Sequence, residues 1–200
     1  MLLLFGEMDP GNGDGQMDLN TDPRVCYHSK WMMQPSFEID TTSQEAISKY
    51  LATTFGISAY EGKVFCSYQL MGYGKEKEDR AKLYLWVECQ EFYIDQERVL
   101  RAGSGINLPV VVYLLKTDTG YQIVESQRPG EGEAYANDVR ELFPQNLWAT
   151  IFPNPDETPP YASYNTRAEM LYNVNQQSAL LFFLLSEPGE WNIAIPLPVP

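Results

Sequence analysis

The first regular pattern of apolar residues along the chain has helical spacing. Thr42 and Glu45 stand three residues apart just ahead of it, which matches a capping box, and Gly56 behind it is suited to end a helix. The apolar positions share one helical face and are Ile47, Tyr50, Leu51 and Phe55. The pattern predicts a helix over residues 43–55.

After this helix the apolar period changes to two, which is typical of β-strands. Residues 63–71 and 83–92 alternate in this way on either side of a charged segment, 74–80. The two segments predict a β-hairpin, and we expect its turn to be symmetric about residues 77 and 78.

A second hairpin is predicted further along the chain. An apolar run over 108–115 and an alternating run over 121–125 flank a tight-turn sequence, 117–120. The preceding Gly103-Ser104-Gly105 has neither the length nor the following helix of a phosphate-binding loop, so it is predicted to be a turn.

Helical periodicity returns after the second hairpin. Residues 136–143 show an apolar helical pattern that Pro144 ends, and a last helix is predicted over 166–184 with Asn165 as its N-cap. The tail, 195–200, alternates aliphatic residues with proline and is expected to be extended.

Together these elements predict an α+β fold: one helix, then a curved four-stranded antiparallel meander, with C-terminal helices packed on the sheet. We expect an irregular acidic leader over 1–40 and a single α+β domain over 41–152. A Pro-rich segment, a C-terminal helix and an extended tail over 153–200 are expected to pack on the same domain.

The composition narrows the classes of partner. Hydrophobic residues make up 44% of the chain, which is enough for a packed core. The formal net charge of -13 repels phosphate backbones, so nucleic acid is not expected as a partner. The longest apolar run, 179–185, is far shorter than the roughly 20 residues of a membrane span, so none is predicted. The oligomeric state is not indicated.

The chain has three cysteines, so it can form at most one internal disulfide. In the symmetric hairpin Cys66 lies opposite Cys89, and opposed residues of an antiparallel pair come close to disulfide reach. The pair is therefore a disulfide candidate, which would fit an exported protein. The alternative is two buried thiols that pack as small hydrophobic groups.

Three oxygen-bearing residues of the leader, Asn12, Asp14 and Asp18, are candidate metal ligands. Their spacing is that of an EF-hand-type calcium loop. The match fails at the ends, because Pro10 occupies the first-ligand position and Thr21 the position of the bidentate Glu. An acidic leader without calcium is the preferred interpretation, and no other cofactor is indicated.

The chain offers few candidates for catalysis. Glu88 and Glu91 suggest paired carboxylates, but their parity places them on opposite faces of a strand, so a joint role needs a β-bulge. Two separate carboxylates are the preferred interpretation. Cys26 and His28, the one histidine, are close along the chain without an orienting third group. No catalytic residue is assigned.

Aromatic residues mark the sheet face opposite the two cysteines. We call them the aromatic stripe, and they are Phe65, Tyr84, Trp86 and Phe92. The stripe suggests the floor of a binding surface for a protein or a small apolar ligand. The more common alternative is a second packed face covered by the C-terminal helices.

Four segments together resemble a small uncharacterised domain of bacterial exported proteins and lipoproteins. They are Val64–Tyr68, Leu83–Tyr93, Gly103–Val110 and Tyr135–Pro144, and they carry a Tyr-Leu-Trp strand, a Gly-Ser-Gly step into a Leu-Pro-Val strand and a helix ending in Leu-Phe-Pro. The resemblance covers 63–144. It implies a cell-envelope location and brings no known activity. The group usually has an Arg-Asp-Gly-like step after the fourth strand, where this chain has Pro129-Gly130-Glu131-Gly132.

The order of elements is also similar to cystatin-like and NTF2-like architectures, which host inhibitors, binding modules and enzymes alike. The leading hypothesis is a non-catalytic interaction module of the bacterial cell envelope, with a cytoplasmic location as the alternative. The competing hypothesis is a small NTF2-like enzyme or binder that acts on an apolar small molecule through a carboxylate and a tyrosine. A third is a structural accessory domain.

Overall fold

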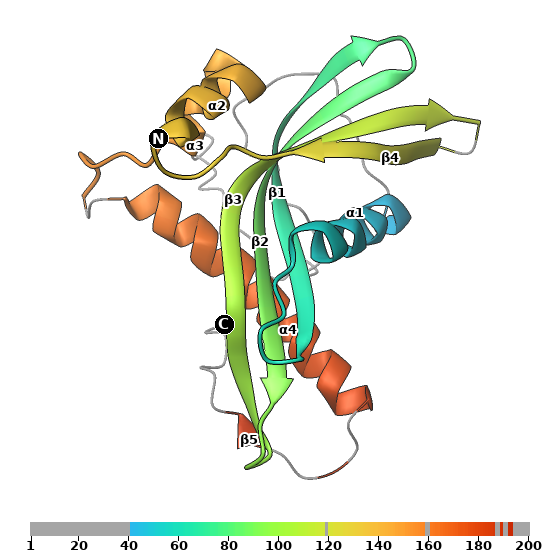
Figure 1. Ribbon diagram of the computed structural model, residues 1–200, viewed down its shortest axis with the longest axis vertical. Coiled ribbons are helices and arrows are strands. Elements are labelled where there is room, and N and C mark those ends of the chain that lie inside the picture. Colours follow the sequence, from blue (N-terminus) through green and yellow to red (C-terminus); the bar gives the residue numbers. More distant parts are fainter. Residues whose placement is uncertain (1–40, 119, 159–160, 187–188, 190–191, 194–200) are drawn as a thin grey trace, which may run out of the picture.

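The computed structural model describes residues 41–118, 120–158, 161–186, 189 and 192–193 (Figure 1). The strands are β1 Lys63–Lys77, β2 Arg80–Ile94, β3 Val99–Thr117, β4 Gly120–Gln127 and the short β5 Asn192–Ile193. The α-helices are α1 Thr41–Phe55, α2 Tyr135–Leu142, α3 Trp148–Ile151 and α4 Ala162–Ser186. Two 3-10 helices, η1 Gly132–Ala134 and η2 Gln145–Leu147, precede α2 and α3.

Strands β1 to β4 form an antiparallel meander in chain order, and β5 pairs in parallel with the start of β3. In Figure 1 the strands bend toward α1, which lies on the concave side of the sheet, and α4 crosses the opposite side. The predicted α+β fold, a helix followed by a four-stranded meander with C-terminal helices, is therefore confirmed.

Helix α1 packs its predicted apolar face on the sheet. Ile47 and Leu51 are buried, and Tyr50 and Phe55 pack at the margin of the same cluster. The strands supply the inward-facing residues of alternate positions, which include Leu83, Leu85, Val87, Val110 and Val112. The side chain of Thr42, the predicted capping residue, lies outside the described residues.

The other face of the sheet is covered by the C-terminal helices. Near α2 and α3, Trp86 and Val111 pack with Val139 and Ile151. A second cluster on this face lies further along α4 and consists of Phe92, Leu100, Ala179 and Phe183. Both faces of the sheet are therefore packed under helices.

In the first hairpin the pairing of the two strands is the predicted one, but the position of the turn is not. Lys77 pairs with Arg80, so the turn is centred one residue later than expected. Two register shifts in β1, between Leu70 and Gly72 and between Lys75 and Lys77, restore the predicted pairing lower in the hairpin. The assumption of a symmetric turn at 77 and 78 is wrong, although the strand pairing it predicted is right.

The prediction of a turn at Gly103-Ser104-Gly105 is wrong, because these residues are part of β3. The register between β2 and β3 shifts at this place, so that two residues of β3 stand against one of β2. A Cβ atom on Gly103 would lie 2.7 Å from Glu91 Oε2, and one on Gly105 would lie 2.6 Å from Gln90 Oε1. Glycine is required at these two positions because the side chains of β2 approach the backbone of β3 too closely to leave room for a Cβ atom.

Helix α4 begins earlier than predicted, at Ala162. Asn165 lies in its first turn, where its N–H donates to Tyr161 O at 2.9 Å, so it is not the N-cap. The carboxylate of Glu157 takes the capping role instead, because it accepts hydrogen bonds from Ser163 N at 2.8 Å and from Ser163 Oγ at 2.7 Å.

Candidate functional site

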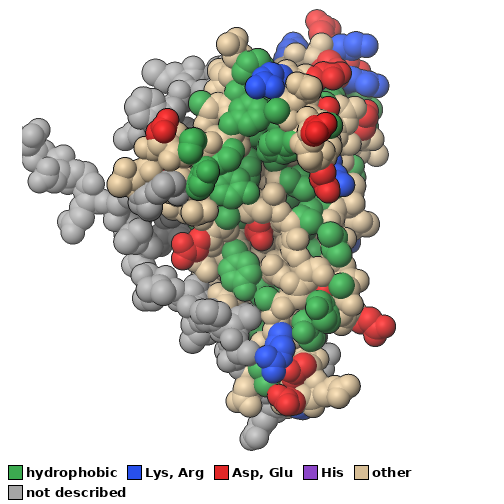
Figure 2. Space-filling view, turned by 60° about the vertical axis from the view of Figure 1, so that its left-hand side comes forward, with side chains coloured by type: hydrophobic (Ala, Val, Ile, Leu, Met, Phe, Trp, Pro, Cys, Tyr) green, Lys and Arg blue, Asp and Glu red, His purple; other side chains and the backbone are tan. Residues whose placement is uncertain are grey.

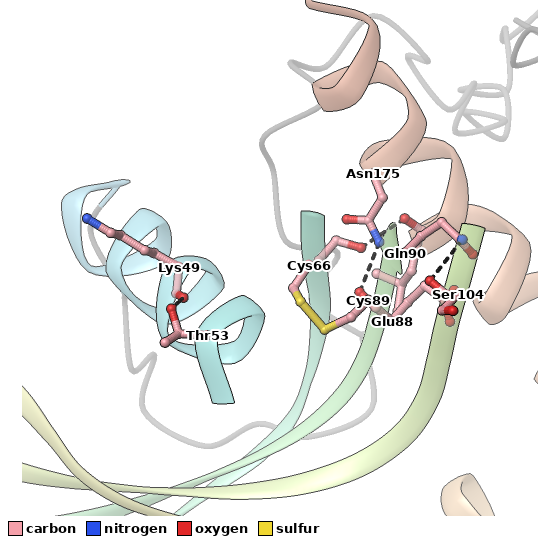
Figure 3. Close-up of a disulfide and its surroundings, with 10 residues drawn as sticks. Lys49, Thr53, Cys66, Glu88, Cys89, Gln90, Ser104 and Asn175 are labelled. Carbon is pink, nitrogen blue, oxygen red and sulfur yellow. Dashed lines mark hydrogen bonds between the residues drawn. A yellow bond between two sulfur atoms is a disulfide. The ribbon is translucent and has the colours of Figure 1, made fainter. Parts of the chain in front are cut away.

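Cys66 and Cys89 are joined by a disulfide, as predicted. They are directly opposed on β1 and β2, and their Cα atoms lie 4.1 Å apart (Figure 3). Both cysteines are buried on the face of the sheet that α1 covers. Disulfides are typical of proteins in oxidising compartments.

On the opposite face, beneath α4, a row of polar side chains crosses three neighbouring strands. Ser67 of β1 is opposed to Glu88 of β2, and Glu88 in turn to Asn107 of β3. Ser67 and Glu88 are buried, with 8% and 7% of their surface exposed. We call these three residues the polar row. Helix α4 also buries two polar residues, Asn175 and Gln176. Buried polar groups normally have hydrogen-bond partners, but the amide nitrogen of Asn107 has none.

Helix α4 is hydrogen-bonded to the sheet at the polar row. Ser67 Oγ donates to the carbonyl oxygen of Leu171 at 2.8 Å, and Asn175 Nδ2 donates to the main-chain oxygen of Glu88 at 2.9 Å. Figure 3 shows Asn175 reaching from α4 to the strand that carries Glu88, next to the disulfide. The helix is thus fixed to the sheet at the position of the buried carboxyl group.

The environment of Glu88 favours the protonated carboxyl group. Burial raises its pKa from 4.5 to about 7, and the neighbouring Asn107 opposes this shift only in part. Trp86 Nε1 donates to Asn107 Oδ1, whereas the amide nitrogen of Asn107 is buried without a hydrogen-bond partner. The pKa of Tyr172 on α4 is also raised, chiefly by burial and to a smaller extent by the charge of Glu88.

Glu91 lies on the other face of β2, and its environment favours the ionised carboxylate. It is fully buried and its carboxylate accepts main-chain hydrogen bonds from Gly62 and Tyr60 at 2.8 and 3.0 Å and from Ala59 at 3.0 Å. Ser58 Oγ donates to it at 2.9 Å. Burial alone would raise the pKa of Glu91, but these donors lower it to about 2. Glu91 therefore stays ionised and anchors the loop that joins α1 to β1.

The two carboxyl groups do not form a catalytic pair. Glu88 faces α4, whereas Glu91 faces the loop after α1, as their parity predicts. The register shift in this region involves residues 103 and 104 of β3 and does not bring the carboxyl groups together. They remain two separate carboxylates with different environments.

The aromatic stripe lies under the C-terminal helices. Trp86 and Phe92 are buried, and Tyr84 and Phe65 are half-buried. Each of the four contacts an aromatic ring of the C-terminal part of the chain, and the pairs are Phe65–Phe182, Tyr84–Phe143, Trp86–Tyr164 and Phe92–Tyr172. This placement agrees with a second packed face, and a binding role for the stripe stays a prediction.

Other candidates from the sequence lie outside the described residues. These are the calcium candidates Asn12, Asp14 and Asp18, the pair Cys26 and His28, and the tail 195–200. Within the described ranges, no group of three or more His, Cys, Asp or Glu side chains is placed to hold a metal ion. No helix among the same residues is long and apolar enough to cross a membrane.

Sequence reasoning did not find Asn107, Tyr172 or Asn175. A signal was present, because Ser67 and Glu88 are polar at positions where the alternation calls for residues that face a helix. That signal predicts a buried polar pair, but the partners come from β3 and from α4, about twenty and more than eighty residues further along the chain.

Comparison of the chain with protein-family models, with curated proteins and with solved structures gave no match.

Proposed function

We propose that this domain is a non-catalytic interaction module that works in an oxidising compartment. The observation that carries the proposal is the disulfide between Cys66 and Cys89. Thiols in the cytosol are kept reduced, whereas disulfides persist in exported and extracellular proteins. The bacterial cell envelope is the location expected from the sequence resemblance of 63–144.

The apolar surface supports an interaction role. Figure 2 shows hydrophobic side chains at the surface on one face of the molecule, with many of the charged groups toward its ends. At the end of α4, several large apolar residues are more than one third exposed, and they are Leu181, Phe182, Leu184 and Leu185. Phe182 contacts the half-buried Phe65, so this exposed surface adjoins one end of the aromatic stripe. We take the partner to be a protein that contacts the exposed apolar residues at the end of α4.

The compartment is tested by the oxidation state of the cysteines in cells. The chain is expressed in a bacterium with and without an export signal, cells are quenched with an alkylating reagent, and the intact mass is measured. We expect one alkylated cysteine in the exported protein and three after reduction. Three alkylated cysteines in exported protein that has not been reduced would contradict the proposal.

The contact surface is tested with a site-specific photo-crosslinker placed at Leu184 in the exported protein. A matched control carries the crosslinker at Tyr161, which is exposed at the other end of α4. A specific adduct of one mass at 184 and not at 161 supports an interaction surface. An equal distribution of adducts at the two positions would reject it.

A second candidate function is a small enzyme or binder of an apolar molecule with an NTF2-like arrangement. Glu88 favours it, since a buried carboxyl with a pKa of about 7 is suited to general acid and base catalysis. Catalysis requires that small molecules reach the carboxyl group. The test is labelling with a carbodiimide and a small amine at pH 6.5, with peptide mass analysis. Labelling of Glu88 in the folded protein favours the enzyme, and labelling only after denaturation rejects it.

A further inference from the structure

The interface between α4 and the sheet combines an apolar and a polar part. Leu171, Ala179 and Phe183 are the apolar residues of α4 that are buried along it. Between Leu171 and Ala179 the interface contains the polar row, where both side-chain hydrogen bonds from Ser67 and Asn175 are made. A charge that forms at this place is opposed by the low polarity of the surrounding contacts.

No basic group compensates an ionised Glu88 among the described residues that surround it. The neighbouring strands present neutral side chains, Ser67 on β1 and Asn107 on β3. Helix α4 presents Asn175, the titratable phenol of Tyr172 and the buried amide of Gln176. The nearest cation on α4, Arg167, lies over the Trp86 ring at 4.7 Å and donates to Thr150 O at 2.9 Å.

We propose that the polar row is a proton-operated latch: α4 is docked on the sheet when Glu88 carries its proton, and ionisation of Glu88 favours release of α4. Release brings the carboxylate into water, where its charge is solvated. It also separates three members of the aromatic stripe, Phe65, Trp86 and Phe92, from their aromatic partners on α4.

The direction of the effect follows from proton linkage. The pKa of Glu88 in the docked state is raised to about 7, whereas a solvated glutamate has the ordinary value of 4.5. The docked state therefore binds the proton more tightly, and docking weakens as the pH rises from 4.5 through 7. Above this window the effect is complete. Docking is therefore weakest above about pH 7, and a change of pH across this window shifts the balance between docked and released α4.

The latch itself depends on the structure alone, and its consequence for binding rests on the proposed function. In that setting, release of α4 controls access of an apolar partner to the aromatic stripe. Failure of the latch would leave the proposed compartment and the exposed end of α4 unaffected. Failure to find a partner would leave the proton linkage standing.

The test is amide hydrogen exchange of the full chain at pH 5.5 and pH 8.5, analysed by peptide and corrected for the intrinsic pH dependence of exchange. We expect the protection of the central part of α4 to fall by up to about 30-fold between the two values, as calculated from pKa values of 4.5 and 7. The effect should be confined to α4 and the strand segments beneath it. Protection of α4 that is the same at both pH values would overturn the proposal.

Glu88→Gln gives a neutral side chain of the same shape, and α4 in this variant should be protected equally at both pH values. The matched control is Glu169→Gln, which removes an exposed carboxylate from the same helix and should leave the wild-type pH dependence unchanged. Wild-type pH dependence that persists in Glu88→Gln would assign the effect to another group and overturn the latch. Binding of the apolar dye anilinonaphthalene sulfonate gives a second readout: it should increase at pH 8.5 in the wild type and in Glu169→Gln, but not in Glu88→Gln.

Discussion

Cys66 lies directly opposite Cys89, although the turn of their hairpin is not where a symmetric pairing requires it to be. If the register at the turn continued without interruption, Cys66 would face Glu91 instead. The two β-bulges of β1 correct the register before the strands reach the cysteines. The disulfide therefore locks a pairing that depends on irregularities elsewhere in the hairpin.

Removal of this disulfide should destabilise the domain. The bridge joins residues 23 positions apart, and a closed loop of this length is expected to contribute about 3 kcal/mol through the unfolded state. Replacement of both Cys66 and Cys89 by Ala should reduce the free energy of unfolding by that amount in urea titration without reductant. With reductant present, the wild type and the double variant should unfold at more similar urea concentrations. An unchanged midpoint in the double variant would show that the bridge does not form.

The free energy of unfolding should depend on pH through Glu88. Its folded pKa of about 7 lies above the ordinary value of 4.5, so the folded state is favoured by protonation and loses stability as the pH rises between these values. Glu88→Gln should therefore be about 3 kcal/mol more stable than the wild type at pH 8 and nearly equal to it at pH 4. Denaturant titration at several pH values measures the difference. A difference that did not change with pH would contradict the raised pKa.

Glu91 should have the opposite pH dependence. Its folded pKa of about 2 lies below 4.5, so its contribution is present above the ordinary value and is lost as the pH falls from 4.5 toward 2. Glu91→Gln leaves several main-chain donors of residues 59–62 without a full acceptor, and should cost about 3 kcal/mol at pH 7. Ser58→Ala removes one donor only and should cost about 1 kcal/mol. Equal losses for both variants would indicate that the main-chain donors are not what the carboxylate stabilises.

Much of the architecture was predictable because it rests on local periodicity. The apolar positions of α1 and the alternation of β1 and β2 identify the helix, the strands and their buried faces. The bulges were not predictable, since an extra residue in one strand is recognised only against its partner. The start of α4 was missed for a similar reason: Glu157 caps it from a preceding loop, at a spacing that no helix-start pattern includes.

The candidate site, too, was predictable only in part. The parity of β2 predicts that Glu88 and Glu91 face different sides of the sheet, and the structure agrees. Their different chemistry was not predictable, because it is decided by the partners. Glu91 meets a loop with free N–H groups, whereas Glu88 meets a helix that offers neutral side chains. Such partners are selected by tertiary packing.

Gly103 gives a direct test of the close approach between β2 and β3. A Cβ atom there would lie 2.7 Å from Glu91 Oε2 and 2.9 Å from Tyr60 Cδ2, both closer than normal contact. Gly103→Ala should therefore cost about 2 kcal/mol, because the carboxylate must leave its donors or the strand must shift. The matched control is Gly72→Ala in β1, where the nearest atom would be Leu147 Cδ1 at 3.6 Å, and the change should be small.

The origin of the Gly103 effect can be separated by combining it with Glu91→Gln. If the added methyl group acts by displacing the carboxylate, the double variant should lose less stability than the sum of the two single variants, since the same hydrogen bonds are broken only once. Urea titration of the four proteins at pH 7 gives the coupling free energy. Strict additivity would show that Gly103 is needed by the backbone of β3 alone and that its proximity to Glu91 has no energetic consequence.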